Sequence, residues 1–408
     1  MGGIRKKVSK FNIAIFHLAF IYSGGGEKLV LQEAEGLKNL GHNVRIFTSV
    51  VNRKHCFPDL LKKIHIETFL PQFRYLVEKH ESTLILLSCA LAPFFAFRFR
   101  NFDVIIAANQ PSPWIAYWVN KLFAVPYISY LAQPTRILHA RTIDKKTGLK
   151  FAGKTSSSFS ARLVEKVKPF IKWADEVSIR NSDSILANGN YIKSVLENVY
   201  RVPVTSCPAG VQHQIGNNKS KIAKRKRYLL ITNRHYAQKR FEYGLFTLAY
   251  IIHKHPGFRL IITGEETDYT RTVRAVATQL GLSDSVDFVG YVNEAKLAKL
   301  YKEATVYLYT APEEDFGMGI IEAMAVGTPV VAWNNAGPTG IIKHNVTGLL
   351  TRPFDAADFS RQVERLLSNT SFYNKISKSA PQSIKKDFSF KSHVNLLAKQ
   401  LTMNDKQN

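Results

Sequence analysis

The sequence predicts an α/β protein that folds into two doubly wound, Rossmann-like domains. Short apolar runs of strand type alternate with helical patterns along the chain, which is the order that builds parallel sheets. The length of 408 residues suits two domains of ordinary size. Residues 214–227 (QIGNNKSKIAKRKR) are polar and basic, as in a linker, and a clear strand pattern begins afresh at residue 228.

Composition narrows the classes of partner. Apolar residues make up 45% of the chain and aromatic residues 12%, which is enough for a folded core. The formal charge of +25 indicates an anionic partner, and charge alone leaves nucleic acid, anionic lipid and a phosphorylated ligand open. Three widely spaced cysteines predict neither a disulfide framework nor a cysteine-rich metal site.

The chain start and the apolar runs predict a cytoplasmic protein without a spanning helix. The first ten residues are basic and lead directly into a strand pattern, without the long apolar segment of a secretory signal. The longest apolar run, residues 84–97, is shorter than the roughly 20 residues that span a bilayer, and Pro93 interrupts it. The wider stretch 75–99 is interpreted as a buried helix or, because basic residues flank it, as a helix that dips into a membrane surface.

Residues 12–48 open the first domain as strand, glycine turn, helix and strand. The turn at residues 22–26 (YSGGG) lies at the helix N-terminus, where unpaired N–H groups suit a phosphate. Gly25 and Gly26 would let the backbone approach that phosphate. The spacing is not the G-x-G-x-x-G of dinucleotide sites. Because glycine turns are common in α/β folds, a purely structural role is the alternative.

The later elements continue the same alternation. In the first half the pattern predicts strands at residues 103–107 and 126–131, a polar loop at 142–160 and a helix at 161–174. In the second half it predicts strands at residues 228–232, 259–264, 286–292 and 306–309, and a final helix at 389–401. Ligands of such parallel sheets bind at the carboxyl ends of the strands, so the site is expected there.

One stretch, residues 313–327 (EEDFGMGIIEAMAVG), concentrates the candidate chemistry. Glu314 and Glu322 bracket a glycine-bearing turn that opens a short helix, so carboxylates and a helix N-terminus are expected to face one pocket. A carboxylate accepts hydrogen bonds from neighbouring hydroxyls while main-chain N–H groups donate to others, and this combination suits a sugar. The alternative is a helix cap at Glu314 and a solvated Glu322.

The sequence PEEDFGMGIIEAMAVGTPVVA resembles the E-x7-E signature of retaining glycosyltransferases of family 4. The resemblance implies the GT-B fold, in which two Rossmann-like domains face each other across a cleft. It implies that Glu314, Phe316, Gly317 and Met318 hold the transferred sugar and that Glu322 binds the ribose of a nucleotide. Within this family, the chain is most similar to mannosyltransferases that extend lipid-linked oligosaccharides.

The resemblance assigns two cations to the donor diphosphate, Arg234 and Lys239, which follow the first strand of the second half. A departing nucleoside diphosphate gains negative charge at the transition state, and fixed cations stabilise that charge where it develops. Glu314, Arg234 and Lys239 are therefore the expected catalytic residues. Basic residues after a strand are otherwise more often solvated.

Further donor contacts follow from the same resemblance. SGGGEKLVLQEAEGLKNLGHNVRIFT resembles the opening of the family's first domain, which places Gly25 and Gly26 near the donor phosphates. Gly290 and Tyr291 stand where the family has its base-binding loop. No cofactor or metal ion is expected besides the nucleotide-sugar substrate.

The acceptor side departs from the family pattern. YLAQPTRILH is similar to a family segment Y-C-H-x-P-x-R-x-L, whose histidine reaches towards the transferred sugar, but this chain has Ala132 at that place. Gln133, Arg136 and His139 are the candidate acceptor-side residues.

These observations divide the chain as follows: an acceptor-binding domain at residues 1–213, a basic linker at 214–227, a nucleotide-sugar domain at 228–385, and a helix at 386–408 that crosses back to the first domain. The resemblance implies retaining transfer of a hexosyl residue, with mannose as the leading sugar. GDP-mannose is the leading donor and a UDP-sugar stays open. The expected acceptor is a lipid-linked saccharide or polysaccharide precursor at the cytoplasmic face of an anionic membrane, to which the protein would bind peripherally.

Two other classes of function stay open. A catalytically silent sugar-nucleotide-binding homologue would explain Ala132. A nucleic-acid-binding protein would explain the charge, but the sequence has no recognisable module with interleaved basic and aromatic residues, so no nucleic-acid partner is expected.

Overall fold

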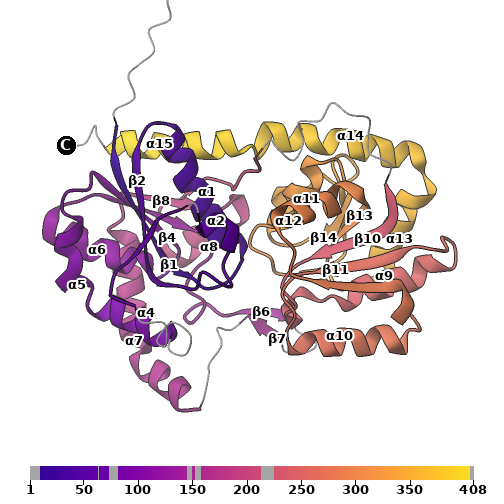
Figure 1. Ribbon diagram of the computed structural model, residues 1–408, viewed down its shortest axis with the longest axis horizontal. Helices are drawn as coiled ribbons and strands as arrows, with labels where there is room; N and C mark the ends of the chain where they lie inside the picture. Colours follow the sequence, from indigo (N-terminus) through magenta and orange to yellow (C-terminus); the bar gives the residue numbers. More distant parts are fainter. Residues whose placement is uncertain are drawn as a thin grey trace, which may run out of the picture.

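The computed structural model of the chain describes residues 10–62, 64–72, 81–144, 149–151, 158–212 and 225–404. Predictions for residues 1–9 and 73–80, and for most of the linker at 214–227, lie outside these residues. Two separate parallel sheets stand side by side, each with its own helices (Figure 1). The predicted α/β architecture of two doubly wound domains is therefore confirmed.

The first domain is built on a sheet of seven parallel strands in the order β3-β2-β1-β4-β5-β8-β9. The central strand β1 is buried over most of its length, as expected of a strand that is covered by helices on both faces. In this register Ile15 lies between Ile46 and Ile106. The strands are β1 (Asn12–Phe20), β2 (Asn43–Val51), β3 (Ile66–Thr68), β4 (Val104–Ala108), β5 (Tyr127–Leu131), β8 (Ser184–Ala187) and β9 (Thr205–Ser206).

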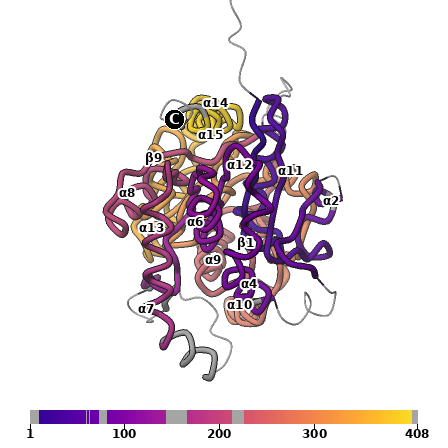
Figure 2. The backbone as a smooth tube through the Cα atoms, turned by 90° about the vertical axis from the view of Figure 1, so that its left-hand side faces the viewer, coloured from indigo at the N-terminus to yellow at the C-terminus, as the bar shows by residue number. Residues whose placement is uncertain are grey.

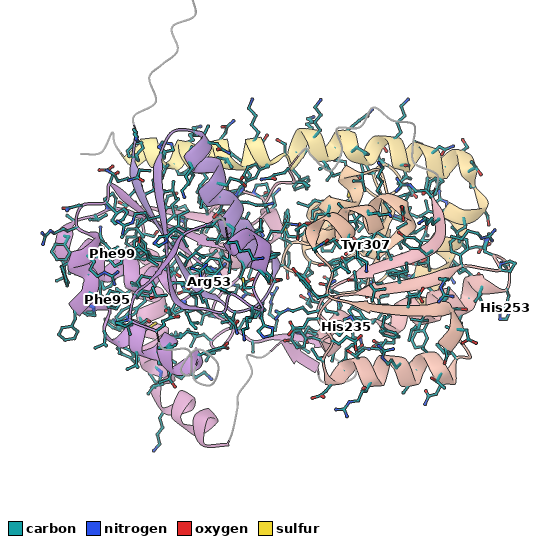
Figure 3. All side chains as sticks on the ribbon, in the orientation of Figure 1. Arg53, Phe95, Phe99, His235, His253 and Tyr307 are labelled. Atoms are coloured by element: carbon teal, nitrogen blue, oxygen red, sulfur yellow. The ribbon has the colours of Figure 1, made fainter. Side chains whose placement is uncertain are left out.

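Helices cover both faces of this sheet. They are α1 (Gly25–Asn39), α2 (Pro58–Leu61), α4 (Glu81–Ala90), α5 (Ala92–Phe95), the 3-10 helix η1 (Ala96–Phe99), α6 (Ser112–Phe123), α7 (Ser158–Arg180) and α8 (Asn190–Tyr200). On one face, aromatic rings fill the core: Phe16 meets Phe99 at 4.8 Å and Phe69 at 5.1 Å between ring centroids. Figure 3 shows Phe95 and Phe99 inside this domain.

Two predictions for the first domain are wrong. The described part of 75–99 is not one buried helix, because the chain breaks at Leu91, just before Pro93, into α4, α5 and η1, and several of its side chains are exposed. The stretch 142–160 is not only a loop, because β6 (Arg141–Asp144) and β7 (Leu149–Phe151) pair as an antiparallel hairpin and α7 already begins at Ser158.

The second domain is built on six parallel strands in the order β12-β11-β10-β13-β14-β15. The strands are β10 (Lys226–Thr232), β11 (Arg259–Thr263), β12 (Val286–Gly290), β13 (Ala304–Tyr309), β14 (Val330–Trp333) and β15 (Leu349–Thr351). The helices are η3 (Ala237–Lys239), α9 (Glu242–Ile252), α10 (Asp268–Gln279), η4 (Ser283–Ser285), α11 (Glu294–Glu303), α12 (Met318–Ala325), η5 (Gly337–Gly340) and α13 (Ala356–Ser368). β10 begins at Lys226, so the last two residues assigned to the linker belong to this strand. Tyr307 and His235 lie in its interior (Figure 3).

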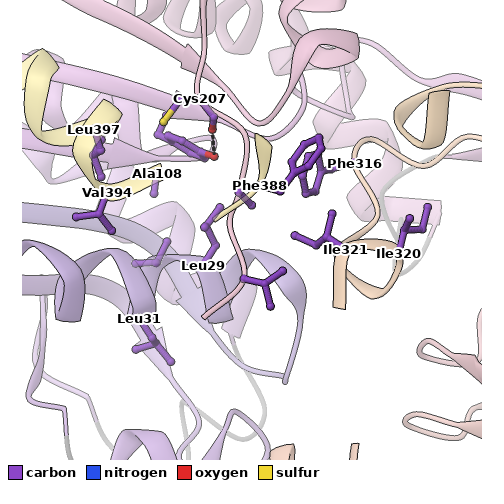
Figure 4. Packing of buried hydrophobic residues seen from close by; sticks show 14 of the residues in the cluster. Leu29, Leu31, Ala108, Cys207, Phe316, Ile320, Ile321, Phe388, Val394 and Leu397 are labelled. Atoms are coloured by element: carbon purple, nitrogen blue, oxygen red, sulfur yellow. Dashed lines mark hydrogen bonds between the residues drawn. The ribbon is translucent and has the colours of Figure 1, made fainter. Parts of the chain in front are cut away.

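The C-terminal helices α14 (Thr370–Asp387) and α15 (Phe390–Asn404) run along both domains, and α15 lies on the first (Figure 1). Ser389 pairs with Val211 between the two helices. Buried apolar residues form one cluster that includes Leu29 of α1, Phe316 at the start of α12, and Leu397 of α15 (Figure 4). The two domains are therefore packed against each other rather than joined by a linker alone.

A buried ion pair fastens α15 to α1. His393 Nε2 lies 3.0 Å from Glu33 Oε1, and Nδ1 lies 2.9 Å from the carbonyl oxygen of Pro208. Burial opposes a charge here, but the bonds to Cys207 and Glu33 outweigh it and raise the pKa of His393 to about 10. No helix in the described part of the chain combines the length and the apolar composition needed to cross a membrane.

Candidate active site between the two domains

The turn before α12 is shaped by two glycines. Gly317, the N-cap residue, has φ of 111°, which a residue with a Cβ rarely adopts. A Cβ on Gly319 would come within 2.2 Å of the Tyr307 hydroxyl, so the helix can lie this close to the sheet only with glycine there. The loop from the carboxyl end of β13 to α12 thus brings Glu314 and Glu322 to the edge where parallel sheets bind ligands.

Glu314 is paired with Lys239. Lys239 Nζ lies 2.5 Å from Glu314 Oε2, and both side chains are largely buried. Burial would raise the pKa of Glu314, but Lys239, the Tyr309 hydroxyl and Arg136 lower it by more, so the net shift is downward. Two predicted catalytic residues therefore meet, and Glu314 is ionised at neutral pH.

Arg234 reaches from the second domain to the first. Its guanidinium carbon lies 3.6 Å from the centroid of the Tyr22 ring, at the glycine turn before α1. Nearby, Glu27 in the first turn of α1 is 7% exposed. Burial raises the pKa of Glu27 to about 7, although Arg234 and Arg136 act in the opposite direction. A cation of the second domain thus faces an aromatic ring and a carboxyl group of the first.

Glu322, the residue expected on a ribose, holds a lysine of the first domain. Lys28 Nζ lies 2.7 Å from Glu322 Oε1 and 2.6 Å from Glu294 Oε2, and the side chains of Lys28 and Glu322 are only 11% and 8% exposed. Burial would lower the pKa of Lys28, but the two carboxylates raise it above its ordinary value. Sequence reasoning missed Lys28. The available signal was a lysine directly after the glycine turn, one turn into α1.

A second ion pair between the domains joins Arg141 of β6 to Asp315. The Arg141 guanidinium also donates to the Tyr191 hydroxyl at 3.3 Å. Burial raises the pKa of Asp315 to about 6; Arg141 opposes this shift, while the charge of Glu314 adds to it. Sequence reasoning missed Arg141 because it lies next to the stretch interpreted as a loop.

The three acceptor-side candidates do not all lie at the cleft. Arg136 lies near the carboxylates of Asp315 and Glu314. Their charges raise the pKa of Arg136, but burial lowers it by more. Gln133 Oε1 accepts from Arg136 Nε at 2.6 Å, so Gln133 orients that guanidinium. His139 instead packs against Tyr200 in the first domain, with the ring centroids 6.1 Å apart. The structure thus brings Gln133 and Arg136 to the cleft and leaves His139 beside Tyr200.

The glycines and the base-binding candidates take the following places. A Cβ on Gly25 would lie 3.2 Å from Met318, so the glycine turn of the first domain and the start of α12 face each other closely. A Cβ on Gly26 would lie 3.8 Å from the side-chain nitrogen of Asn109. Phe316 is buried, whereas Tyr291 is exposed after Gly290 at the carboxyl end of β12.

The free space between the domains is unevenly distributed. A cavity of about 370 Å³ is lined by the start of α8, Asp315, Phe316, η5 and Lys343, among others. Beside Lys239 and Glu314 the hollow measures only about 10 Å³. The side chains of Lys239 and Glu314 therefore leave little free space beside them, and the larger cavity lies on the other side of Asp315 and Phe316. Within the described residues no cluster of histidine, cysteine, aspartate and glutamate could hold a metal ion.

Comparisons with family models match both halves of the chain. Residues 23–214 match the model for Glycosyltransferase Family 4, and residues 214–383 match that for Glycosyl transferases group 1. The two models meet at residue 214 and together cover residues 23–383.

Named proteins with similar sequences include mannosyltransferases. The chain is 23% identical over 432 residues to alpha-1,3/1,6-mannosyltransferase ALG2 of Homo sapiens, covering 98% of both chains. It is 28% identical over 172 residues to the GDP-Man:Man(3)GlcNAc(2)-PP-Dol alpha-1,2-mannosyltransferase of Dictyostelium discoideum, which is 39% of this chain and 34% of that protein.

Among solved structures, HepE of Anabaena in complex with UDP and glucose matches with a TM-score of 0.72 at 17% identity. The match covers 96% of this chain and 99% of that one, so the whole two-domain arrangement is shared.

Proposed function

Since the chain is a glycosyltransferase with the GT-B fold, related to mannosyltransferases, we propose that it moves a mannosyl residue from a nucleotide sugar to a lipid-linked saccharide with retention of configuration. The observation that carries this proposal is the buried pair of Lys239 and Glu314 at the start of α12, with Arg234 beside it at the domain boundary. A cation and a carboxylate at one helix N-terminus suit a diphosphate and a sugar that are bound as one ligand.

Arg234 and Lys239 act on the leaving group in this proposal. The bond between the sugar C1 and the diphosphate oxygen breaks, the acceptor oxygen bonds to C1 on the same face, and the acceptor proton passes to a donor phosphate oxygen. Both cations stabilise the charge that collects on the diphosphate. Lys239 must then share its ammonium group between Glu314 and a phosphate, which three donor hydrogens allow.

The two glutamates have separate roles. Glu314, held ionised, accepts hydrogen bonds from sugar hydroxyls, and the N–H groups at Phe316, Gly317 and Met318 donate to others. Glu322 binds the ribose after Lys28 has moved away from it. Because Lys28 belongs to the first domain, donor binding and the position of the two domains are coupled through this contact.

GDP-mannose is the leading donor. Its support is the likeness to a relative whose name specifies GDP-Man, and a UDP-sugar stays the alternative. The base would lie on the exposed edge formed by Gly290 and Tyr291, where an aromatic ring is free to stack on it.

The acceptor is proposed to be a saccharide on a lipid phosphate or diphosphate, at the cytoplasmic face of a membrane. The same relative is named for an acceptor on PP-Dol. The formal charge of +25 suits a protein that binds peripherally to an anionic surface, where each nearby lysine or arginine contributes about 1 kcal/mol.

A second candidate function is a homologue that binds a sugar nucleotide without transferring the sugar. It is favoured by Ala132, which offers no side-chain group for chemistry at a place where the family pattern has histidine. Only a transfer assay separates this candidate from the first.

The test is a thermal-shift panel of nucleotide sugars combined with an assay for released nucleoside diphosphate. We expect GDP-mannose to stabilise the protein most, by about 2.7 kcal/mol at a hundredfold excess over its Kd, and transfer to release GDP. Lys239→Ala should lose the shift, whereas the control Lys254→Ala, at an exposed lysine of the same domain, should keep it. Stabilisation without GDP release would favour the silent homologue, and no stabilisation by any nucleotide sugar would contradict both candidates.

A further inference from the structure

An apolar face is exposed on the side of the first domain that points away from the second domain. Figure 2 looks at this side and shows α4, α6 and α7 turned towards the viewer. We call it the outer face and define it by eight exposed side chains, from the α4–η1 segment and from α7. They are Leu86, Leu87, Leu91, Phe94, Phe97, Val167, Phe170 and Trp173. They make up eight of the eighteen exposed large apolar side chains of the described residues, so exposure of this kind is concentrated here.

These side chains form two groups, which we call rows. In the first row, Leu86 and Leu87 belong to α4, Leu91 precedes α5, Phe94 belongs to α5 and Phe97 to η1, so each of the three short helices has an exposed apolar side chain. Phe94 is 75% exposed, whereas its neighbour Phe95 is buried in the core. The segment therefore divides its aromatic residues between the core and the surface.

The second row lies on α7. Val167, Phe170 and Trp173 follow one another at intervals of three residues, and Phe170 is 58% exposed. The buried residues of α7 follow further along the helix: Ala174, Asp175, Ser178 and Ile179. The exposed part of α7 before them thus carries large apolar side chains among its lysines, where a surface helix ordinarily has polar ones.

Trp114 of α6 joins the two rows. Its indole N–H donates to the carbonyl oxygen of Cys89 in α4 at 3.1 Å. Its ring also meets the rings of Phe170 and Trp173 of α7, at centroid distances of 6.0 and 5.6 Å. One buried side chain therefore contacts both elements, so α4 and α7 both pack against α6 on this side of the domain. Apolar patches that extend over several elements mark interaction sites on soluble proteins.

Basic side chains flank the outer face. On α7, Lys166 and Lys172 are exposed and directly adjoin Val167 and Trp173 in the sequence. On the other row, Arg98 and Arg100 are exposed beside Phe97. The further described basic residues on these elements and α6 are Lys121, Lys168 and Arg180. The acidic ones are Glu81, the buried Asp175, and Glu176, which lies 3.9 Å from Lys172. Cations therefore outnumber carboxylates around the apolar rows.

We propose that the outer face is the surface by which the protein docks on a lipid bilayer that contains anionic lipid. Its phenylalanine, leucine and tryptophan side chains enter the boundary between headgroups and acyl chains, and the lysines and arginines contact lipid phosphates. A second copy of the chain would bring two faces of like charge together, whereas an anionic bilayer complements the charge. This assignment rests on the proposed function, because a lipid-linked acceptor would require the protein to reach a membrane. It does not depend on the chemistry of the cleft.

The test is the partition of Phe94→Ser/Phe97→Ser between buffer and vesicles of phosphatidylcholine with one-third phosphatidylglycerol. Full burial of one phenylalanine is worth about a tenfold to hundredfold change in a partition constant, so we expect the pair to lower partition by at least about tenfold. The matched control is Phe246→Ser/Tyr250→Ser, which removes two exposed aromatic residues of α9 in the second domain and should leave partition unchanged. Lys166→Gln/Lys172→Gln should weaken binding at low salt and have little effect at high salt.

Trp173 supplies a second measurement that does not depend on the Phe pair. Brominated lipid should quench tryptophan emission of the wild type on vesicles, and Trp173→Phe should lose most of that quenching while it keeps most of its partition. Unchanged partition of the Phe pair, an equal loss in the control pair, or quenching that survives Trp173→Phe would overturn the proposal. A change from dimer to monomer in the Phe pair would assign the face to a second copy instead.

The cleft is assayed separately with a water-soluble saccharide acceptor. Vesicle-binding variants should keep wild-type transfer in that assay because none of them alters a cleft residue. Docking without transfer by the wild type would contradict the proposed function alone, and transfer without docking would contradict this inference alone.

Discussion

The two domains form the two sides of the interdomain cleft, which we call its walls. The residues that face the cleft come from one short stretch on one wall and from separate elements on the other. On the wall of the second domain, Glu314 and Glu322 belong to one short stretch around the N-terminus of α12, and Lys239 reaches Glu314 from the next loop of the same sheet. On the wall of the first domain, Lys28 of α1 pairs with Glu322, and Arg141 of the β6–β7 hairpin pairs with Asp315 of the same stretch.

This difference has a chemical consequence. Glu314 is neutralised within its own domain by Lys239, so its charge is compensated wherever the first domain stands. Glu322 and Asp315 are neutralised across the boundary, by Lys28 and Arg141. Opening of the cleft therefore removes the partners of Glu322 and Asp315 but not that of Glu314. The carboxylate proposed for the sugar is therefore pre-organised within its own domain, whereas the state of the carboxylate proposed for the ribose depends on domain position.

The largest effect is expected at the pre-organised carboxylate. Glu314→Gln should lower transfer at least about a hundredfold, because two charged hydrogen bonds, each worth about 1.5–3 kcal/mol, are lost from the sugar side of the site. Affinity for the bare nucleoside diphosphate should change little, since that ligand does not contain the sugar. Single-turnover transfer and titration calorimetry measure the two quantities.

Two variants control this prediction. Glu313→Gln removes the neighbouring carboxylate, which accepts from Asn335 at 2.7 Å, and should keep most activity. Glu322→Gln should weaken the nucleoside diphosphate itself through the ribose. Identical binding profiles for Glu314→Gln and Glu322→Gln would show that the two glutamates do not have the separate roles proposed.

A smaller effect, of opposite sign, is expected at Lys28. Lys28→Met frees Glu322 from a charged hydrogen bond of 2.7 Å, so we expect nucleoside diphosphate to bind about tenfold more tightly. Glu294→Gln is the matched control, because it leaves Lys28 on Glu322 and should not raise the affinity. Weaker binding by Lys28→Met in calorimetry would mean that Lys28 is part of the donor site rather than a competitor for Glu322.

The same comparison explains what the sequence could predict. Glu314, Gly317 and Glu322 occupy fixed positions relative to one helix, so their spacing alone places them, and the GT-B fold predicted from this motif is confirmed. The contact of Lys28 with Glu322 spans 294 residues of sequence and exists only because the two domains pack together. No local pattern contains that information.

Two further differences between the sequence predictions and the structure have local causes. The hairpin at Arg141 was interpreted as a loop because its surroundings are rich in serine, lysine and glycine, although the strand RTID contains β-branched residues. For the segment 75–99 the sequence leaves a buried helix and a helix at a membrane surface open, because hydrophobicity alone does not tell which side of a helix faces the core. The difference between Phe94 and Phe95 could be resolved only by the structure.

The last prediction compares one buried carboxyl group from each wall by its effect on stability. Glu27, on the first-domain wall, has a pKa of about 7, raised by burial from an ordinary value near 4.5. The folded state therefore holds a proton that the unfolded state releases, and the stabilisation is lost as pH rises from about 4.5 through 7. A shift of this size corresponds to at most roughly 3 kcal/mol. Glu314, on the other wall, has a lowered pKa, so its contribution is present above pH 4.5 and is lost as pH falls.

Denaturant unfolding between about pH 3 and 8 should therefore show opposite slopes when the variants are subtracted from the wild type, with the Glu314 difference changing below about pH 4.5 and the Glu27 difference changing above it. Glu27→Gln cannot lose a proton, so it should gain stability relative to the wild type as pH rises towards 8. Glu314→Gln should lose stability relative to the wild type at neutral pH and less so in acid. Asp315 also titrates near pH 6, and the charge of Glu314 raises its pKa, so the Glu314 difference includes a contribution from Asp315, whereas Glu314 is not altered in the Glu27 comparison. If the stability differences of Glu27→Gln and Glu314→Gln changed with pH in the same direction, the opposite pKa shifts of these two groups would be contradicted.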